Sequence, residues 1–343
     1  MYTTSRERIM GSYSPILFDS YLTVVVLLLI IGVSFGVNEE AQLSYDHYKF
    51  TCPRVETIVQ REMLSIFLTD PTAPAAFLRL FFHDCQVQGC DASILLDGND
   101  STNKLSEMVS SRNFGIRNRE TIGLIKSKLE FECPGKVSCA DIIALAARES
   151  VSLSGPRIQI PLGRRDSTTY SSQQADADLP PQGITVDELI HIFDSKGMNL
   201  EESVAILGAH TLGVGHCQNI GSRLYDPQPG DQMDQKFEAF LRKICPGRIP
   251  LTNLCFAPND GTPAIFDNQY YRDVLKGRGL FGIDSNISRD PRTAPIVRQF
   301  AVDQNHFFGV FSSAFVKLSS TNVLTNGEGQ VRRQCNRINV DER

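Results

Sequence analysis

Apolar side chains recur every three or four residues along most of this chain, which is the pattern of helices with one buried face. The clearest sets are Ile122, Ile125 and Leu129; Ala140, Ile143 and Ala147; and Ile296, Phe300, Phe307, Phe311 and Phe315. Each set lies in a stretch without internal proline. We therefore predict a mostly α-helical fold.

Two helix starts are marked by capping boxes, in which a capping side chain and a glutamate three residues later satisfy each other's backbone N–H groups. Thr185 with Glu188 forms the first box, and Gly197 supplies a stop for that helix. Asn199 with Glu202 repeats the device for the next helix.

Strand signals are few. Residues 157–162 and the Asn326-Gly327 turn are the best candidates for β structure. No internal repeat or low-complexity linker interrupts the chain, and its length is near the size at which one core begins to split. We predict one mostly α domain with minor β structure, in one or two lobes.

The N-terminal segment has the features of a targeting signal. Arg6 and Arg8 precede the uncharged apolar run 22–37, which is shorter than the ~20 residues of a spanning helix. We predict a signal peptide and leader at 1–41, removed between positions 36 and 42, and a mature domain at 42–343. The alternative is an uncleaved membrane anchor. The first reading predicts a secreted, extracellular protein without stable membrane association.

Composition narrows the possible partners and the compartment. The net charge of −5 argues against nucleic acid, because phosphate binding favours a basic face. The chain has nine cysteines and no CxxC pair, which favours disulfides over zinc after a signal peptide. Spacing alone leaves the pairing open, and the odd number leaves one thiol over. Asn99 and Asn286 begin N-glycosylation sequons, typical of a secreted glycoprotein.

The first chemical signal is a basic pair. Arg79 and His83 are four residues apart in a predicted helix, so they project from the same face. A base and a fixed cation aimed together suit proton transfer while negative charge develops nearby. His210 lies between small residues, in GAHTLG, which leaves room for a flat ligand. The alternative for each histidine alone is a hydrogen-bonded structural role.

The second signal is a loop rich in oxygen ligands. Asp84, Gly89, Asp91 and Ser93 follow the basic pair, and calcium takes six to eight such oxygens. A capped, solvated turn would have the same residues. A more scattered set, Thr211, Thr262 and Asp267, follows later in the chain.

Several motifs together resemble one family. They are, in order, RLFFHDC with GCDAS (79–93), VSCADI (137–142), PLGRRDS (161–167), GAHTLG (208–213) and FDNQYY (266–271). The chain resembles the secreted plant haem peroxidases, or class III peroxidases, from about residue 42 to residue 339. The resemblance implies a two-lobed, mostly α fold with haem b between distal and proximal helices.

The resemblance also implies a role for each matching residue. His83 is the distal base, Arg79 the distal cation, and Asn113 the residue that orients His83. Phe82 packs against this pocket.

On the other side His210 ligates the haem iron, and Asp284 accepts its second ring proton. Pro180 helps to position the reducing substrate. The implied activity is reduction of hydrogen peroxide with one-electron oxidation of phenolic donors, in cell-wall metabolism, lignification or the oxidative stress response, by a monomer.

Two calcium ions and four disulfides follow from the same resemblance. The first calcium would be bound by Asp84, Val87, Gly89, Asp91 and Ser93, and the second by Thr211, Asn259, Thr262, Ile265 and Asp267. The implied disulfides are Cys52–Cys133, Cys85–Cys90, Cys139–Cys335 and Cys217–Cys245, which leaves Cys255 unpaired.

Two departures from the family pattern bear on function. Asn259 stands where an aspartate is usual, which predicts a weaker second calcium site. Asn219 stands near the haem edge where an aromatic residue is common. Two alternative functions compete with that of a secreted phenol-oxidising peroxidase. A glycoprotein that keeps the fold without turnover conflicts with the complete set of pocket residues, and an intracellular ascorbate-type peroxidase conflicts with the leader and the cysteines.

Overall fold

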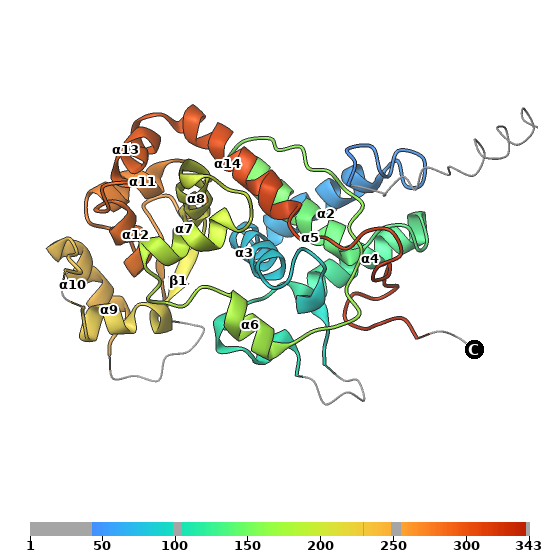
Figure 1. Ribbon diagram of the computed structural model, residues 1–343, viewed down its shortest axis with the longest axis horizontal. Helices are drawn as coiled ribbons and strands as arrows, with labels where there is room; N and C mark the ends of the chain where they lie inside the picture. Colours follow the sequence, from blue (N-terminus) through green and yellow to red (C-terminus); the bar gives the residue numbers. More distant parts are fainter. Residues whose placement is uncertain (1–42, 99–104, 229, 248–254, 341–343) are drawn as a thin grey trace, which may run out of the picture. The chain divides into compact units, whose positions relative to one another are not determined.

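The computed structural model describes residues 43–98, 105–228, 230–247 and 255–340, and these residues are mainly helical (Figure 1). The α-helices are α2 (Val55–Thr69), α3 (Ala73–Gln86), α4 (Arg119–Glu132), α5 (Cys139–Ser152), α6 (Ser172–Asp178), α7 (Val186–Asp194), α8 (Leu200–Leu207), α9 (Gly221–Tyr225), α10 (Gln235–Ile244), α11 (Gln269–Leu275), α12 (Gly282–Ile287), α13 (Ala294–Val302) and α14 (Gln304–Ser319). The 3-10 helices are η1 (Ser93–Leu95), η2 (Glu107–Val109), η3 (Ser111–Asn113), η4 (Gly208–Thr211) and η5 (Cys217–Asn219). The predicted leader and the sequon at Asn99 lie outside the described residues.

The core is built around α5, which is buried on nearly every side, as its run of alanine and isoleucine requires. Helix α3 packs against α5 and buries Phe77 and Leu80. Helix α14 covers α3 through Phe315, whose ring stacks on Phe81 with centroids 4.5 Å apart. This packing on two sides fixes α3, the helix that carries the basic pair.

The predicted helix starts are confirmed. The backbone N–H of Thr185 donates to Glu188 at 2.8 Å at the start of α7, and that of Asn199 donates to Glu202 at 2.9 Å at the start of α8. Gly197 follows α7 with a φ of +73°, a left-handed conformation that glycine adopts without strain. The stop signal therefore lies where the sequence placed it.

The predicted strand at 157–162 is wrong. Those residues make a single bridge, between Ser44 and Leu162. Within the described residues the sheet consists of β1 (Val214–His216) and β2 (Phe256–Pro258), paired antiparallel. The Asn326-Gly327 turn does form, since both residues have positive φ and Glu328 N–H donates to the Thr325 carbonyl.

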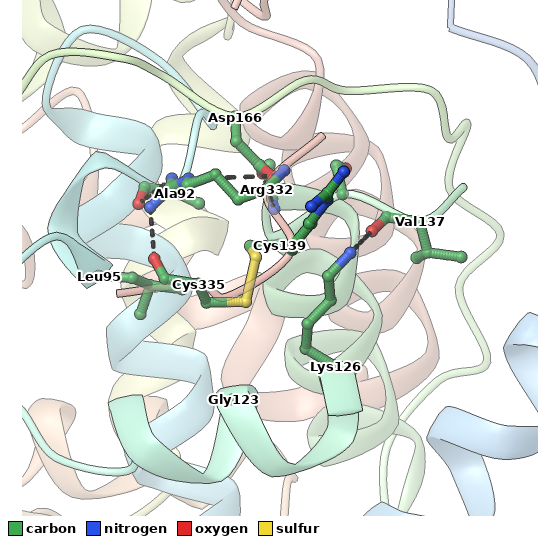
Figure 2. Close-up of a disulfide and its surroundings, with 12 residues drawn as sticks. Ala92, Leu95, Gly123, Lys126, Val137, Cys139, Asp166, Arg332 and Cys335 are labelled. Atoms are coloured by element: carbon green, nitrogen blue, oxygen red, sulfur yellow. Dashed lines mark hydrogen bonds and ion pairs between the residues drawn. A yellow bond between two sulfur atoms is a disulfide. The ribbon is translucent and has the colours of Figure 1, made fainter. Parts of the chain in front are cut away.

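Four disulfides hold the described chain together, in the pairs that the resemblance implied: Cys52–Cys133, Cys85–Cys90, Cys139–Cys335 and Cys217–Cys245. Cys255 is the free thiol of the described residues. Figure 2 shows the bond between Cys139, at the start of α5, and Cys335. Beside it the fully buried Arg332 donates to the Ala92 carbonyl at 2.6 Å, and its backbone N–H donates to Asp166 at 2.8 Å (Figure 2).

A buried ion pair joins α5 to the segment after it. The Arg164 guanidinium lies 2.7 Å from Asp141, and both side chains are fully buried. Asp141 also accepts from the Tyr48 hydroxyl at 2.6 Å and from the Gly163 backbone at 2.8 Å. Asp141 thus has several donors besides Arg164, which helps to offset the cost of burying its charge.

Candidate active site

A cavity of about 760 Å³ lies between α3 and the segment that follows α8. Arg79, Phe82 and His83 line it from α3, and His210 lines it from η4. Cofactor-sized ligands usually occupy cavities of roughly 300–1,000 Å³ with few polar groups. The two histidines singled out in the sequence thus share one space.

The wall formed by α3 contains a base in a defined orientation. Nδ1 of His83 lies 2.7 Å from Oδ1 of Asn113, whose Nδ2 donates to the Glu107 carbonyl at 2.8 Å. Since the amide nitrogen is used by Glu107, the amide oxygen faces the imidazole and accepts its Nδ1 proton. Nε2 of His83 is therefore the atom free to accept a proton.

The electrostatics of this wall keep the base neutral. Burial lowers the pKa of His83 well below its usual value, the charge of Arg79 adds to the shift, and the hydrogen bond to Asn113 opposes it. Burial also lowers the pKa of Arg79 to about 10, so it remains a cation at neutral pH. A neutral imidazole and a cation therefore face the same cavity.

The opposite wall presents His210. Its Nδ1 lies 2.9 Å from Oδ1 of Asp284, which is buried in α12. Oδ2 of Asp284 accepts from the Phe281 backbone at 2.7 Å, so the carboxylate is fixed at the start of its helix. An imidazole held in this way offers Nε2 as a ligand with raised basicity.

Two glycines near His210 allow close packing of the chain around it. A Cβ on Gly213, whose φ is +88°, would approach Ala75 of α3 to 2.5 Å. A Cβ on Gly208 would approach Phe307 and the Tyr271 hydroxyl to less than 3 Å. Gly213 and His210 both line the cavity, and its aromatic and aliphatic walls fit a flat apolar group ligated by His210.

Buried oxygens gather at the last turn of α3 and in the residues after it. Oδ1 of Asp84 and Oγ of Ser93 are buried without a hydrogen-bond partner, and burial together with the charge of Asp91 raises the pKa of Asp84 well above its usual value. Among the described residues no three His, Cys, Asp or Glu side chains come together as a metal site. The carboxylates of Asp84 and Asp91 with the Ser93 hydroxyl instead suit a hard cation such as calcium.

A second group of oxygens lies beside His210. Thr211 Oγ1 donates to Asp260 at 2.7 Å and lies 3.2 Å from Asp267, which also accepts from Thr262 at 3.1 Å. The Ile265 carbonyl lies 3.5 Å from the same Thr211 hydroxyl.

The sequence placed Asn259 in this second group, and the structure brings Asp260 there as well. The Asn259 backbone N–H donates to the Gly213 carbonyl at 3.1 Å, its Nδ2 donates to the Leu212 carbonyl at 3.1 Å, and its Oδ1 is buried without a hydrogen-bond partner. Burial raises the pKa of Asp260 to about 6. A carboxylate therefore lies one residue after Asn259, the position where an aspartate is usual.

Comparisons with known proteins decide the family. The family model described as Peroxidase matches residues 59–303. Peroxidase 29 of Arabidopsis thaliana is 52% identical over 315 residues, which cover 90% of this chain and 92% of that protein. Peroxidases 21 and 28 of the same plant are each 38% identical, over 92% and 93% of this chain and 96% and 99% of their own lengths. The chain belongs to the class III plant peroxidases. It is therefore a peroxidase, and membership of this family implies haem as its cofactor.

The mouth of the peroxidase cavity is polar. Pro180 lines the cavity, as do Gln182 and Asn219, whose side chains are joined by a hydrogen bond of 3.0 Å. His216 lines it too, packed edge-on against Phe114, and burial with the nearby charge of Arg79 lowers its pKa. Amide side chains therefore line this part of the cavity.

Besides Asp260, three residues at these sites were missed from the sequence. Tyr270 donates to Asp284 and lies within FDNQYY, so the motif contained it without indicating its partner. Glu107 is buried near Asp91 and Ser93, and burial raises its pKa to about 8. No sequence motif indicated a role for His216.

Proposed function

We propose that this peroxidase uses hydrogen peroxide to oxidise phenolic donors by one-electron steps, with haem b bound between α3 and η4. The observation that supports this most directly is the pair of oriented histidines, His83 with Asn113 and His210 with Asp284, on facing walls of one cavity. His210 would ligate the iron. Bound haem supplies the redox chemistry that cleaves the O–O bond.

The residues of the chain would guide protons and charge. Nε2 of His83 accepts the proton of the entering peroxide and returns it to the leaving oxygen. Arg79 stabilises the negative charge that develops on that oxygen. Asp284 holds the Nδ1 proton of His210, and Phe82 forms part of the wall. Pro180 would position the donor at the mouth.

Replacement of the base tests this assignment. We expect His83→Ala to slow the reaction with peroxide by at least ~100-fold, the usual contribution of a positioned base. The haem absorbance spectrum should persist, because the variant leaves His210 in place. A near-normal rate in His83→Ala would refute the role, and failure of the intact protein to bind haem would refute the proposal as a whole.

We also propose two bound calcium ions, in the oxygen clusters around Asp84 with Asp91 and around Asp260 with Asp267. The first cluster is supported by its unpartnered buried oxygens, and the second by its two carboxylates beside threonine hydroxyls. Metal analysis of the purified protein before chelation would measure their number. Fewer than two bound calcium ions would contradict the proposal.

We propose a secreted monomer that acts in the cell wall, in lignification or in the oxidative stress response. The four disulfides support an oxidising compartment, and Asn286, in the second sequon, is exposed. Within the described residues no helix has the length and apolarity to cross a membrane. N-terminal sequencing of protein recovered outside the cell should begin between residues 37 and 42, and a panel of phenols would identify the donor class.

A further inference from the structure

Asp284 has one more hydrogen-bond donor than the orientation of His210 requires. Its Oδ1 accepts from His210 Nδ1 at 2.9 Å and also from the Tyr270 hydroxyl at 2.8 Å. Tyr270 and Asp284 are each 1% exposed, so water does not compete for this oxygen. The imidazole and the phenol therefore share a single carboxylate oxygen.

Sharing the oxygen weakens its attraction for either proton. Hydrogen bonds to a charged group are strong in a buried site, and each donor withdraws part of the negative charge. With less charge available, the carboxylate draws the Nδ1 proton of His210 less strongly. The imidazole then has less anionic character toward whatever its Nε2 binds.

We propose that Tyr270 is a positioning residue that limits the anionic character of His210 and thereby raises the reduction potential of the haem iron. The proposal rests on ligation of the iron by His210, as proposed above. An anionic imidazole stabilises ferric over ferrous iron, and the second-shell hydrogen bond is one of the means by which a protein sets this balance.

Replacement of Tyr270 by phenylalanine removes the phenol hydroxyl and keeps the ring. The edge-on contacts of that ring can therefore remain. Its centroid lies 5.9 Å from that of His210 and 4.9 Å from that of Tyr271. We expect the equilibrium between ferric and ferrous iron to shift toward the ferric form by about threefold to tenfold. This is a shift of roughly 30–60 mV to more negative potential, because a tenfold change in a one-electron equilibrium is about 59 mV. The iron–histidine stretching frequency of the ferrous protein should rise in parallel.

The neighbouring tyrosine provides a matched control. Tyr271 is fully buried, and its hydroxyl donates to the carbonyls of Val204 and Ala205 at 3.0 and 3.2 Å. Tyr271→Phe removes the same atom one residue away without changing the donors to Asp284. We expect its potential and stretching frequency to match those of the unmodified protein.

The test is a spectroelectrochemical titration with resonance Raman spectra, on the purified haem-loaded protein. Equal shifts in the two variants, or no shift in Tyr270→Phe, would overturn the proposal and leave the peroxidase function intact. Absence of an iron–histidine band in the unmodified protein would instead remove the proposed ligation, and this inference with it. If Tyr270→Phe does not fold, 3-fluorotyrosine at position 270 keeps the hydroxyl as a stronger donor, and the potential should then rise.

Discussion

The hydrogen bond between Asn113 and His83 allows a quantitative test of the distal base. Asn113 is 1% exposed, its Oδ1 lies 2.7 Å from His83 Nδ1, and its Nδ2 is held by the Glu107 carbonyl. Asn113→Ala removes the oxygen acceptor and leaves the buried imidazole N–H without a partner.

The expected loss follows from the charge that His83 gains during the reaction. As His83 accepts a proton its ring becomes cationic, and a hydrogen bond to a charged group contributes about 1.5–3 kcal/mol. At 1.36 kcal/mol for each factor of ten, the reaction of Asn113→Ala with peroxide should be between about 10-fold and 150-fold slower. Oxidation of the donor at the mouth should change much less.

A stopped-flow assay of the haem absorbance against peroxide concentration would give the rate constant of the reaction with peroxide. The pH profile of that rate constant also tests the direction in which the pKa of His83 changes. The step requires neutral His83, so the rate falls as pH drops through the pKa of that residue. The Asn113 hydrogen bond raises this pKa, so its removal lowers it. The acid limb of the profile should therefore move to lower pH even as the plateau falls.

Asn268→Ala is a matched control for the loss of a buried asparagine. Asn268 is also 1% exposed, and its amide donates to the carbonyls of Phe300 and Ala301, between α11 and α13. It should cost stability without slowing the peroxide step. The reasoning would be refuted if the two variants behaved alike, or if the acid limb of Asn113→Ala moved to higher pH.

Three further outcomes are expected. Asp141→Ala leaves the buried Arg164 unpaired and should lower the free energy of unfolding by about 3–5 kcal/mol, measured by denaturant unfolding under non-reducing conditions. Asp260→Asn should weaken the second calcium, measured by metal content after graded chelation, whereas Asn259→Asp should change it little because the amide nitrogen that becomes an oxygen faces the Leu212 carbonyl. Asn219→Phe should lower the KM for bulky aromatic donors by about 2- to 10-fold, the value of one added aromatic contact, measured by steady-state kinetics.

Each of these predictions has a contrary result. A loss below about 1 kcal/mol in Asp141→Ala is typical of an exposed ion pair and would show that the buried charge finds other partners. Stronger calcium retention in Asn259→Asp than in the unmodified protein would return Asn259 to the ligand set. An unchanged KM in Asn219→Phe would mean that donors do not pass residue 219.

Features that depend on neighbours in the chain could be predicted from the sequence. The boxes at Thr185 and Asn199 were predicted because both partners lie within one helical turn. The pairing of β1 with β2 was not, because each strand has three residues and the partners are about forty residues apart. Asp260 was missed because a backbone bond to Gly213 decides which of two adjacent side chains faces the threonines.

The motifs contain the residues proposed to be catalytic but do not indicate all of their hydrogen-bond partners. FDNQYY contains Tyr270, yet the link to Asp284 depends on how α11 and α12 pack. The same limit applies to Glu107, whose neighbours Asp91 and Ser93 come from a separate loop.

The buried Arg332 has a consequence for how the protein is made. Its guanidinium donates to the carbonyls of Asp91 and Ala92, which follow α3. It lies three residues before Cys335, which bonds to Cys139. The loop after α3 therefore gains these donors only once residue 332 has been synthesised, 240 residues after Ala92. A chain that stopped just before Arg332 would contain every residue proposed for the haem pocket and still lack this support. The support of the loop after α3 thus forms later in synthesis than the pocket residues themselves.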